Sequence, residues 1–270
     1  MQKSSKKRLV FCTYSSIYSS IVLKKLLNND AIEVVGIINS TRVINPCYGF
    51  VKGALAQIQL SGWRYASYLF MVTDLFSWLN PSNTIHGLAK KNNIPVFDTV
   101  DINAVEASHF INSKQPDFLL AAHFNQLIKT PLLNLACINI HPSLLPAYKG
   151  VDPVFYALLD NQKILGVTLH KMAESFDTGE ALLQNERASS ADGCLFSNNC
   201  HLFATGAELA IRYLASEETK VSDKVYSKEN DSTENKHYDS WPSRSNVSKL
   251  KQQGKHLIRL KQVWQELRNV

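Results

Sequence analysis

Asn139-Ile140-His141-Pro142-Ser143-Leu144-Leu145-Pro146 is the stretch of this 270-residue chain that says most about its fold. It continues an apolar run that starts at Cys137, and this run is typical of a buried strand that ends at His141. The two prolines restrict the backbone that follows, so the residues between them can form a fixed apolar wall. Because open α/β sheets bind ligands at the carboxyl ends of their strands, a polar strand end followed by a rigid loop predicts a binding site.

Short apolar strands and helical segments alternate on both sides of this stretch. Helical spacing is clear over residues 17–27 and again over 195–214. Strands are predicted over residues 8–13, 32–39, 94–98, 117–123, 137–141, 167–172 and 181–188. Strands that alternate with helices pair in parallel through crossover connections, so the predicted fold class is α/β with a doubly wound, mostly parallel sheet.

The chain is long enough for one principal domain and an appendage. We predict that the principal domain covers residues 8–215. Residues 216–246 are rich in Ser, Asn, Asp, Glu and Lys, which favours a polar linker. Residues 247–270 return to helical spacing and are predicted to form a short C-terminal amphipathic helix, although Gly254 weakens its first half.

Residues 48–79 form an unusually long aromatic and apolar segment. Arg64 and Asp74 interrupt it, so no transmembrane span is expected. Its apolar residues occupy almost every helical face, which predicts burial on several sides. The favoured interpretation is a core helix or a homodimer interface. Peripheral membrane contact, or a lid over an apolar substrate, is the alternative.

Charge and cysteine content set broad limits on function. The net charge of +6 mildly favours an anionic partner. Five scattered cysteines without a CxxC pair favour reduced thiols and a cytoplasmic location. The basic N-terminus leads into serines rather than a continuous apolar run, so no secretory leader is expected. Cys194, Cys200 and His201 lack the spacing and the fourth ligand of a zinc knuckle, so no metal site is predicted.

Two motifs together contain the residue types that acyl transfer to an amine requires. Asn139 and His141 are two residues apart on the predicted strand, so they share a face. Asp177-Thr178-Gly179 follows Gly166-Val167-Thr168-Leu169-His170 further along the chain. The Asn139 amide would donate to an oxyanion, which is worth about 3–4 kcal/mol. Neutral His141 would accept the amine proton, and Asp177 would orient it, stabilise its charged form or hold a relay water.

Each of these residues alone is more often structural. An Asn at a strand end is usually a turn residue, a His beside an apolar strand is usually just hydrogen bonded, and Asp-Thr-Gly is a common turn. Their joint occurrence in this order matters because it resembles a known family. Residues 117–186 resemble the catalytic region of the folate-dependent formyltransferases, through Asn-x-His-Pro-Ser-Leu-Leu-Pro, Gly-Val-Thr-x-His and Asp-Thr-Gly. A weaker resemblance covers roughly residues 8–214.

That family includes glycinamide ribonucleotide formyltransferase, methionyl-tRNA formyltransferase and the N-formyltransferases of nucleotide-linked amino sugars. The resemblance implies a Rossmann-like fold and transfer of a formyl group from 10-formyltetrahydrofolate to a primary amine. It implies that Asn139, His141 and Asp177 are catalytic. It also places the folate beside them, partly on main-chain groups of residues 120–127 and of the turn around 176–179. The implied cofactor-binding residues are His123, Phe124, Asn125, Leu144, Phe176, Thr178 and Gly179.

The acceptor amine is the open question. The first strand–helix turn, residues 13–16, lacks the glycine that the family often has there. Its hydroxyls and helix N-terminus suit an anion, but close backbone approach to a phosphate is less assured. A nucleotide-linked amino sugar or another small anionic amine is favoured, because it tolerates the short tail and the altered turn. Methionyl-tRNA is the alternative, and a formyltetrahydrofolate hydrolase or a non-catalytic folate-binding protein is a further one.

Overall fold

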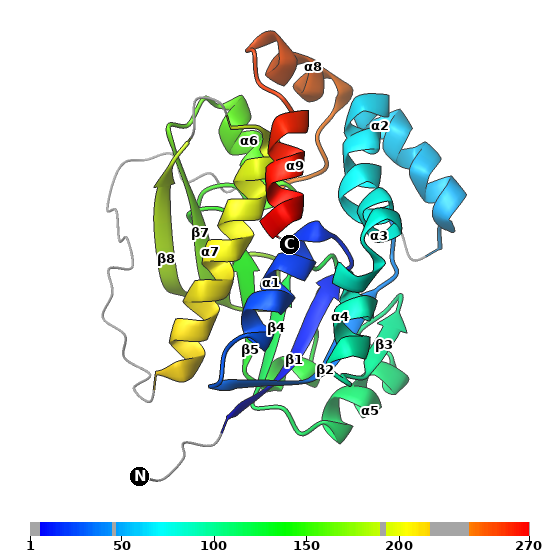
Figure 1. The fold of residues 1–270 in the computed structure, drawn as a ribbon, viewed down its shortest axis with the longest axis vertical. Helices are drawn as coiled ribbons and strands as arrows, with labels where there is room; N and C mark the ends of the chain where they lie inside the picture. Colours follow the sequence, from blue (N-terminus) through cyan, green and yellow to red (C-terminus); the bar gives the residue numbers. More distant parts are fainter. Residues whose placement is uncertain (1–5, 45–46, 190–192, 217–237, 270) are drawn as a thin grey trace.

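The computed structural model describes residues 6–44, 47–189, 193–216 and 238–269. Its main feature is a seven-stranded sheet of order β3-β2-β1-β4-β5-β7-β8 (Figure 1). The first five strands in this order pair in parallel, and β7 and β8 join antiparallel. Each predicted strand is present, and the predicted doubly wound, mostly parallel sheet is confirmed. The strands are β1 (Lys7–Tyr14), β2 (Ile32–Ser40), β3 (Val96–Thr99), β4 (Phe118–Ala122), β5 (Cys137–His141), β7 (Ile164–Lys171) and β8 (Ala181–Ala188).

Helices cover both faces of the sheet, and the strands alternate their side chains between two cores. Along β1, Leu9 and Phe11 belong to the larger buried cluster, whereas Val10 and Cys12 belong to the smaller one. This alternation explains the continuous apolar run in the sequence, because parallel strands are buried on both faces. The larger cluster includes α1 (Ile17–Leu27), α4 (Ile85–Lys91), α6 (Pro153–Leu159) and α7 (Leu195–Ala215), and the smaller one lies under α5 (Val105–Ser113).

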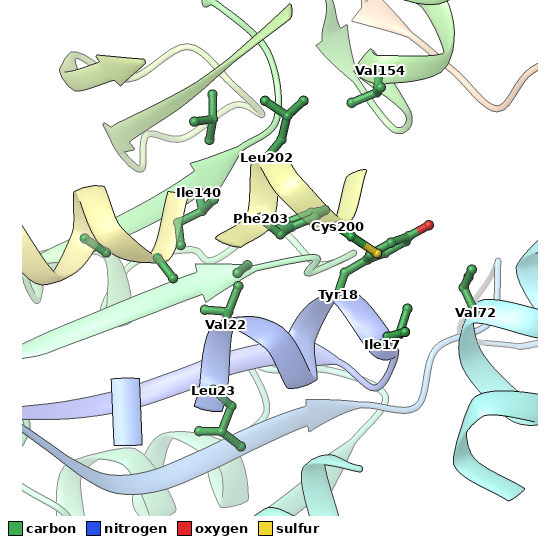
Figure 2. Close-up of a cluster of buried hydrophobic side chains, with 14 of the residues drawn as sticks. Ile17, Tyr18, Val22, Leu23, Val72, Ile140, Val154, Cys200, Leu202 and Phe203 are labelled. Atoms are coloured by element: carbon green, nitrogen blue, oxygen red, sulfur yellow. The ribbon is translucent and has the colours of Figure 1, made fainter. Parts of the chain in front are cut away.

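The pairing of α1 with α7 positions the first strand–helix turn and the centre of the sheet. Figure 2 shows Tyr18 and Val22 of α1 beside Phe203 of α7, in one cluster with Ile140 of β5. The Tyr18 and Phe203 rings stack with centroids 5.5 Å apart. A capping box begins α1. The Ser16 side chain accepts from the Ser19 backbone amide, and the Ser19 side chain accepts from the Ser16 backbone amide. Both helices therefore hold the carboxyl ends of β1 and β5 in fixed positions.

Residues 48–79 fold into α2 (Phe50–Phe70), the π-helical turn η1 (Met71–Leu75) and α3 (Phe76–Leu79). Gly62, with φ 81° and ψ 163°, breaks α2 into two arms that Figure 1 shows at one edge of the molecule. Tyr65, Tyr68 and Val72 are buried against the larger core, but the opposite side is exposed. Within this chain the segment is therefore buried on one side only, and a homodimer interface stays a prediction. No helix in the described residues has both the length and the hydropathy to cross a bilayer.

The C-terminal region differs from its prediction. Instead of one helix over 247–270, the chain forms α8 (Arg244–Gln252) and α9 (Leu260–Asn269). Gly254 lies between them with φ 75°, a left-handed conformation that ends the first helix. The Ser243 side chain caps α8 by accepting from the Asn246 amide, so this helix starts inside the predicted linker.

Most of the predicted linker, residues 217–237, lies outside the described residues. The division into a principal domain, a linker and a tail therefore stays a prediction. Beyond it, a two-residue strand, β9 (Tyr238–Asp239), pairs in parallel with β6 (Lys149–Gly150). This pairing brings the chain back to the carboxyl edge of the main sheet. Two short 3-10 turns complete the described elements, η2 (Pro81–Asn83) and η3 (Leu132–Asn134).

Candidate active site

The sheet brings Asn139, His141 and Asp177 together with a fourth residue, His170. Asn139 and His141 project from the same face of β5. His170 lies directly opposite Asn139 in the antiparallel β5–β7 register, so it shares that face. Asp177 comes from the turn after β7, and its Oδ1 lies 3.4 Å from His141 Nδ1 and 3.8 Å from His170 Nε2. The four side chains form one polar cluster at the edge of an apolar core.

His141 has a hydrogen-bond acceptor at each ring nitrogen. Its Nε2 donates to the Tyr148 carbonyl at 3.0 Å, and its Nδ1 faces Asp177. With Nε2 protonated, the neutral ring has its lone pair at Nδ1. A proton taken up there points at the carboxylate, and the side chains of His141 and Asp177 are only 5% and 9% exposed. Because water screens such a pair poorly, the carboxylate stabilises the charged imidazolium.

His170 holds the Asn139 amide in a fixed orientation. Its Nδ1 lies 2.7 Å from the Lys171 carbonyl oxygen, which requires a proton on Nδ1. Its Nε2 therefore accepts from Asn139 Nδ2, at 3.0 Å. Burial, and then the neighbouring His141, lower the pKa of His170 to about 4, so the ring is neutral at physiological pH. The second Nδ2 hydrogen of Asn139 stays available for another acceptor.

The Asp177 turn depends on close backbone contacts. Asp177 adopts φ 55°, a left-handed conformation that Asp tolerates better than most residues. Its Oδ2 accepts from the Gly150 amide at 3.0 Å, which ties the turn to β6. A Cβ on Gly179 would lie 1.8 Å from the Lys171 carbonyl oxygen, so only glycine lets the turn pack on β7. These contacts aim the carboxylate at His141.

The Pro142–Pro146 loop is fixed from β7 and β8. Thr168 Oγ1 donates to the Ser143 carbonyl at 2.6 Å and accepts from the Leu145 amide at 3.0 Å. Gln184 Nε2 adds a bond to the Leu145 carbonyl at 2.9 Å. Thr168 belongs to the Gly-Val-Thr-Leu-His motif, so that motif supports the loop as well as supplying His170.

A cavity of about 620 Å³ opens beside the polar cluster. Its floor contains Asn139, His141, His170 and Asp177, and one wall comes from α2 and η1. The predicted cofactor residues that line it are His123, Phe124, Asn125 and Phe176. Thr178 lines a shallower hollow next to it with Lys149 and Tyr238.

Two predicted cofactor residues, Leu144 and Gly179, lie away from the cavity lining. A Cβ on Gly166 would come within 2.4 Å of the Leu144 side chain, so Leu144 packs over β7. Gly179 serves the Asp177 turn instead.

His123 and Asn125 use their side chains within the protein. His123 Nδ1 lies 3.1 Å from Ser16 Oγ and 3.2 Å from the Tyr14 carbonyl, and burial lowers the pKa of its ring. The Asn125 side chain accepts from Ser40 Oγ and donates to the Arg42 carbonyl, both at 2.6 Å. Recognition of a ligand along residues 123–125 would therefore fall to their main chain. The cofactor roles of these residues stay predictions.

The cavity is also lined by a buried polar network that the sequence did not reveal. Asp152 Oδ2 accepts from the Tyr65 hydroxyl at 2.7 Å. The Tyr18 and Tyr68 hydroxyls bond to each other at 2.7 Å, and Asn199 donates to Tyr68 at 3.3 Å. Burial raises the pKa of Asp152 to about 6, while its hydrogen bonds oppose that shift. The network attaches α2 to α1, α6 and α7. No sequence signal pointed to it, because its members come from four separate elements.

Comparison with known proteins supports the family that the motifs suggest. Residues 80–191 match the formyl transferase family model. Over 129 residues the chain is 36% identical to methionyl-tRNA formyltransferase of Clostridium acetobutylicum, covering 46% of this chain and 42% of that protein. Over 108 residues it is 38% identical to GDP-perosamine N-formyltransferase of Brucella melitensis biotype 1, covering 39% and 41%.

The fold is shared with phosphoribosylglycinamide formyltransferase from Bacillus halodurans, with a TM-score of 0.52 at 22% identity. That alignment covers 77% of this chain and 94% of the solved one. The sequence matches therefore support the resemblance to the formyltransferase family over residues 80–191. The matched segments span less than half the length of the two relatives named above.

Described residues provide no group of three or more His, Cys, Asp or Glu side chains that would hold a metal ion.

Proposed function

We propose that this chain transfers a formyl group from 10-formyltetrahydrofolate to a primary amine. The observation that carries the proposal is the contact between His141 Nδ1 and Asp177 Oδ1 beside the His170-fixed amide of Asn139. One group accepts a proton, one balances the resulting charge and one donates to an oxyanion. All three border the same cavity.

The residues act in a definite order. Bound 10-formyltetrahydrofolate supplies an activated formyl carbon. When the amine nitrogen bonds to that carbon, the Asn139 Nδ2–H donates to the oxygen that gains negative charge. His141 Nδ1 takes the proton that the amine loses, and Asp177 stabilises the imidazolium. His141 then returns a proton to the departing folate nitrogen as its bond to the formyl carbon breaks, which regenerates the neutral ring.

The cavity suits the proposed donor. Its volume is within the usual range for small-molecule sites, about 300–1,000 Å³. Phe124 and Phe176 provide apolar surface at the end of β4 and after β7. A flat pterin would take its hydrogen bonds from the main chain there, since the side chain of Asn125 is engaged with Ser40.

For the acceptor we favour a small amine, preferably a nucleotide-linked amino sugar. The similarity to a GDP-perosamine N-formyltransferase supports this choice. Methionyl-tRNA is the second candidate, which the similarity to methionyl-tRNA formyltransferase supports. A cytoplasmic location belongs to the same proposal and is supported by the buried thiols of Cys12, Cys137, Cys194 and Cys200.

An assay with labelled donor tests the proposal. Purified protein is given 10-formyltetrahydrofolate with GDP-perosamine, with methionyl-tRNA, or with no acceptor. We expect label on the amino sugar, lost in a His141→Ala variant, and a shallow dependence on ionic strength. Formate release at an equal rate without an acceptor would identify a hydrolase instead. Efficient, steeply salt-sensitive formylation of methionyl-tRNA, with no sugar product, would promote the second candidate.

A further inference from the structure

The outer surface of the α2–α3 segment is unusually apolar. More than half of the exposed large hydrophobic side chains in the described residues lie on it. Trp78 is 82% exposed, Val51 70% and Trp63 67%. We call this surface the α2 patch; it consists of Val51, Leu55, Ile58, Leu60, Trp63, Phe70, Trp78 and Leu79. Large apolar side chains that are exposed together on one segment mark an interaction site.

The arrangement of the patch follows from the two arms of α2. In the first arm Val51, Leu55 and Ile58 recur at intervals of four and three, which places them on one side of a helix. In the second arm Trp63 and Phe70 are two turns apart. Both arms lie at the same outer edge of the molecule, where the first projects from the body (Figure 1). The inner side of the second arm is held by Tyr65 and Tyr68, so its outer side cannot turn inward.

The exposed charges of the α2 patch are positive. Lys52 lies over the Tyr48 ring with Nζ 4.5 Å from the centroid, and the Arg64 guanidinium carbon lies 5.6 Å from the Trp63 ring centroid. The acid of this segment, Asp74, is half-buried and accepts from Thr73 Oγ1 at 2.8 Å. Aromatic rings beside long basic side chains suit the boundary between lipid headgroups and acyl chains.

The α2 patch is continuous with the candidate active site. Ile58, Trp63 and Phe70 belong to the patch and also line the cavity. The apolar surface therefore borders the cavity, and whatever covers the patch also lies beside the cavity.

We propose that the α2 patch docks on an anionic phospholipid surface, with the cavity opening toward the headgroups. Apolar side chains would insert at the headgroup boundary, and Lys52 and Arg64 would pair with lipid phosphates. This geometry needs no spanning helix, and the described residues contain none. A second copy is a poorer match, because a two-fold contact would place the same two cations from both copies in one interface.

Vesicle sedimentation tests docking without any substrate, so its result is separate from that of the formyl-transfer assay. The protein is mixed with phosphatidylcholine vesicles that contain or lack phosphatidylglycerol. We expect sedimentation with the anionic vesicles that weakens at high salt. A Leu55→Ser/Trp78→Ser variant, in which neither residue lines the cavity, should lower the partition coefficient about tenfold or more. The matched control is Val105→Ser/Leu260→Ser, which removes equally exposed apolar side chains outside the patch and should bind like the wild type.

Circular dichroism would verify that both double variants are folded. Failure of the wild type to sediment with anionic vesicles would overturn the proposal, as would equal binding by the patch variant. Analytical ultracentrifugation tests the alternative that a second copy of the chain occupies the α2 patch. A dimer that Leu55→Ser/Trp78→Ser dissociates, found together with no vesicle binding, would assign the patch to a second copy and refute the lipid surface.

Discussion

Neutralising Asp177 is the sharpest test of the proposed chemistry. In Asp177→Asn the side chain keeps its shape and still offers an oxygen to the Gly150 amide, now 3.0 Å away. It loses the negative charge that lies 3.4 Å from His141 Nδ1. At that separation and an effective dielectric constant of about 20, the attraction to an imidazolium is roughly 5 kcal/mol. Since part of it is replaced by solvent and the Asn dipole, we expect kcat to fall about a thousandfold.

The Michaelis constants should change much less. In the proposed mechanism His141 gains its charge only when it accepts the amine proton. Loss of an interaction that is made only at that stage lowers kcat and kcat/KM together. The assay is steady-state transfer of labelled formyl from 10-formyltetrahydrofolate to GDP-perosamine or methionyl-tRNA, with thermal melting to verify the fold.

A matched control lies three residues along the chain. Glu180 is exposed and pairs with Lys171 at 2.6 Å, so Glu180→Gln removes a carboxylate that has no contact with His141. Because exposed ion pairs contribute little, this variant should retain activity within about twofold. The reasoning fails if Asp177→Asn keeps a tenth or more of wild-type kcat, or if Glu180→Gln loses as much.

Three further outcomes are expected. Asp177→Asn should bind 5-formyltetrahydrofolate within about tenfold of the wild type by calorimetry, because the pterin is proposed to rest on main-chain groups and apolar walls; complete loss of binding would make the carboxylate a ligand-holding group. Gly179→Ala, whose Cβ would meet the Lys171 carbonyl at 1.8 Å, should lower the free energy of unfolding by about 1–3 kcal/mol and slow turnover. Gly49→Ala has open space around its Cβ and changes only the N-cap of α2, so it should cost less than about 1 kcal/mol and leave turnover unchanged; equal urea midpoints for the two variants would contradict this. Burial raises the pKa of Asp152 to about 6, so between about pH 4 and pH 6 the folded state holds a proton that the unfolded state has released. The free energy of unfolding of the wild type therefore falls by up to about 3 kcal/mol as pH rises through that window. Asp152→Asn lacks this loss, so its stability relative to the wild type should increase from pH 4 to pH 7 in urea titrations; a pH-independent difference would show that Asp152 is not protonated in the folded state.

Local patterns in the sequence were sufficient for the fold class and for half of the candidate site. The apolar runs predicted strands because side chains of buried parallel strands enter a core on both faces, as Leu9 and Val10 do. Asn139 and His141 were placed on one face by the two-residue period of a strand, which depends on neighbouring residues alone. The family motifs linked both to Asp177.

Contacts between distant elements needed the tertiary structure. His170 stood in a quoted motif, but its bond to Asn139 depends on the antiparallel register of β5 and β7. The apolar faces of α2 looked alike in the sequence, and packing on α1, α6 and α7 decided which of them became buried. Asp152 was invisible for the same reason.

The C-terminal helix shows the limit of periodicity. Helical spacing over residues 247–270 predicted a single helix, yet the chain turns at Gly254 and forms α8 and α9. Helices this short gain most of their stability from the surfaces they pack against. Here α8 packs on α2 and α6, and α9 packs on α7. Residue patterns record what each segment is able to form, whereas register and packing between segments select what it forms, because those energies depend on residues far away in the chain.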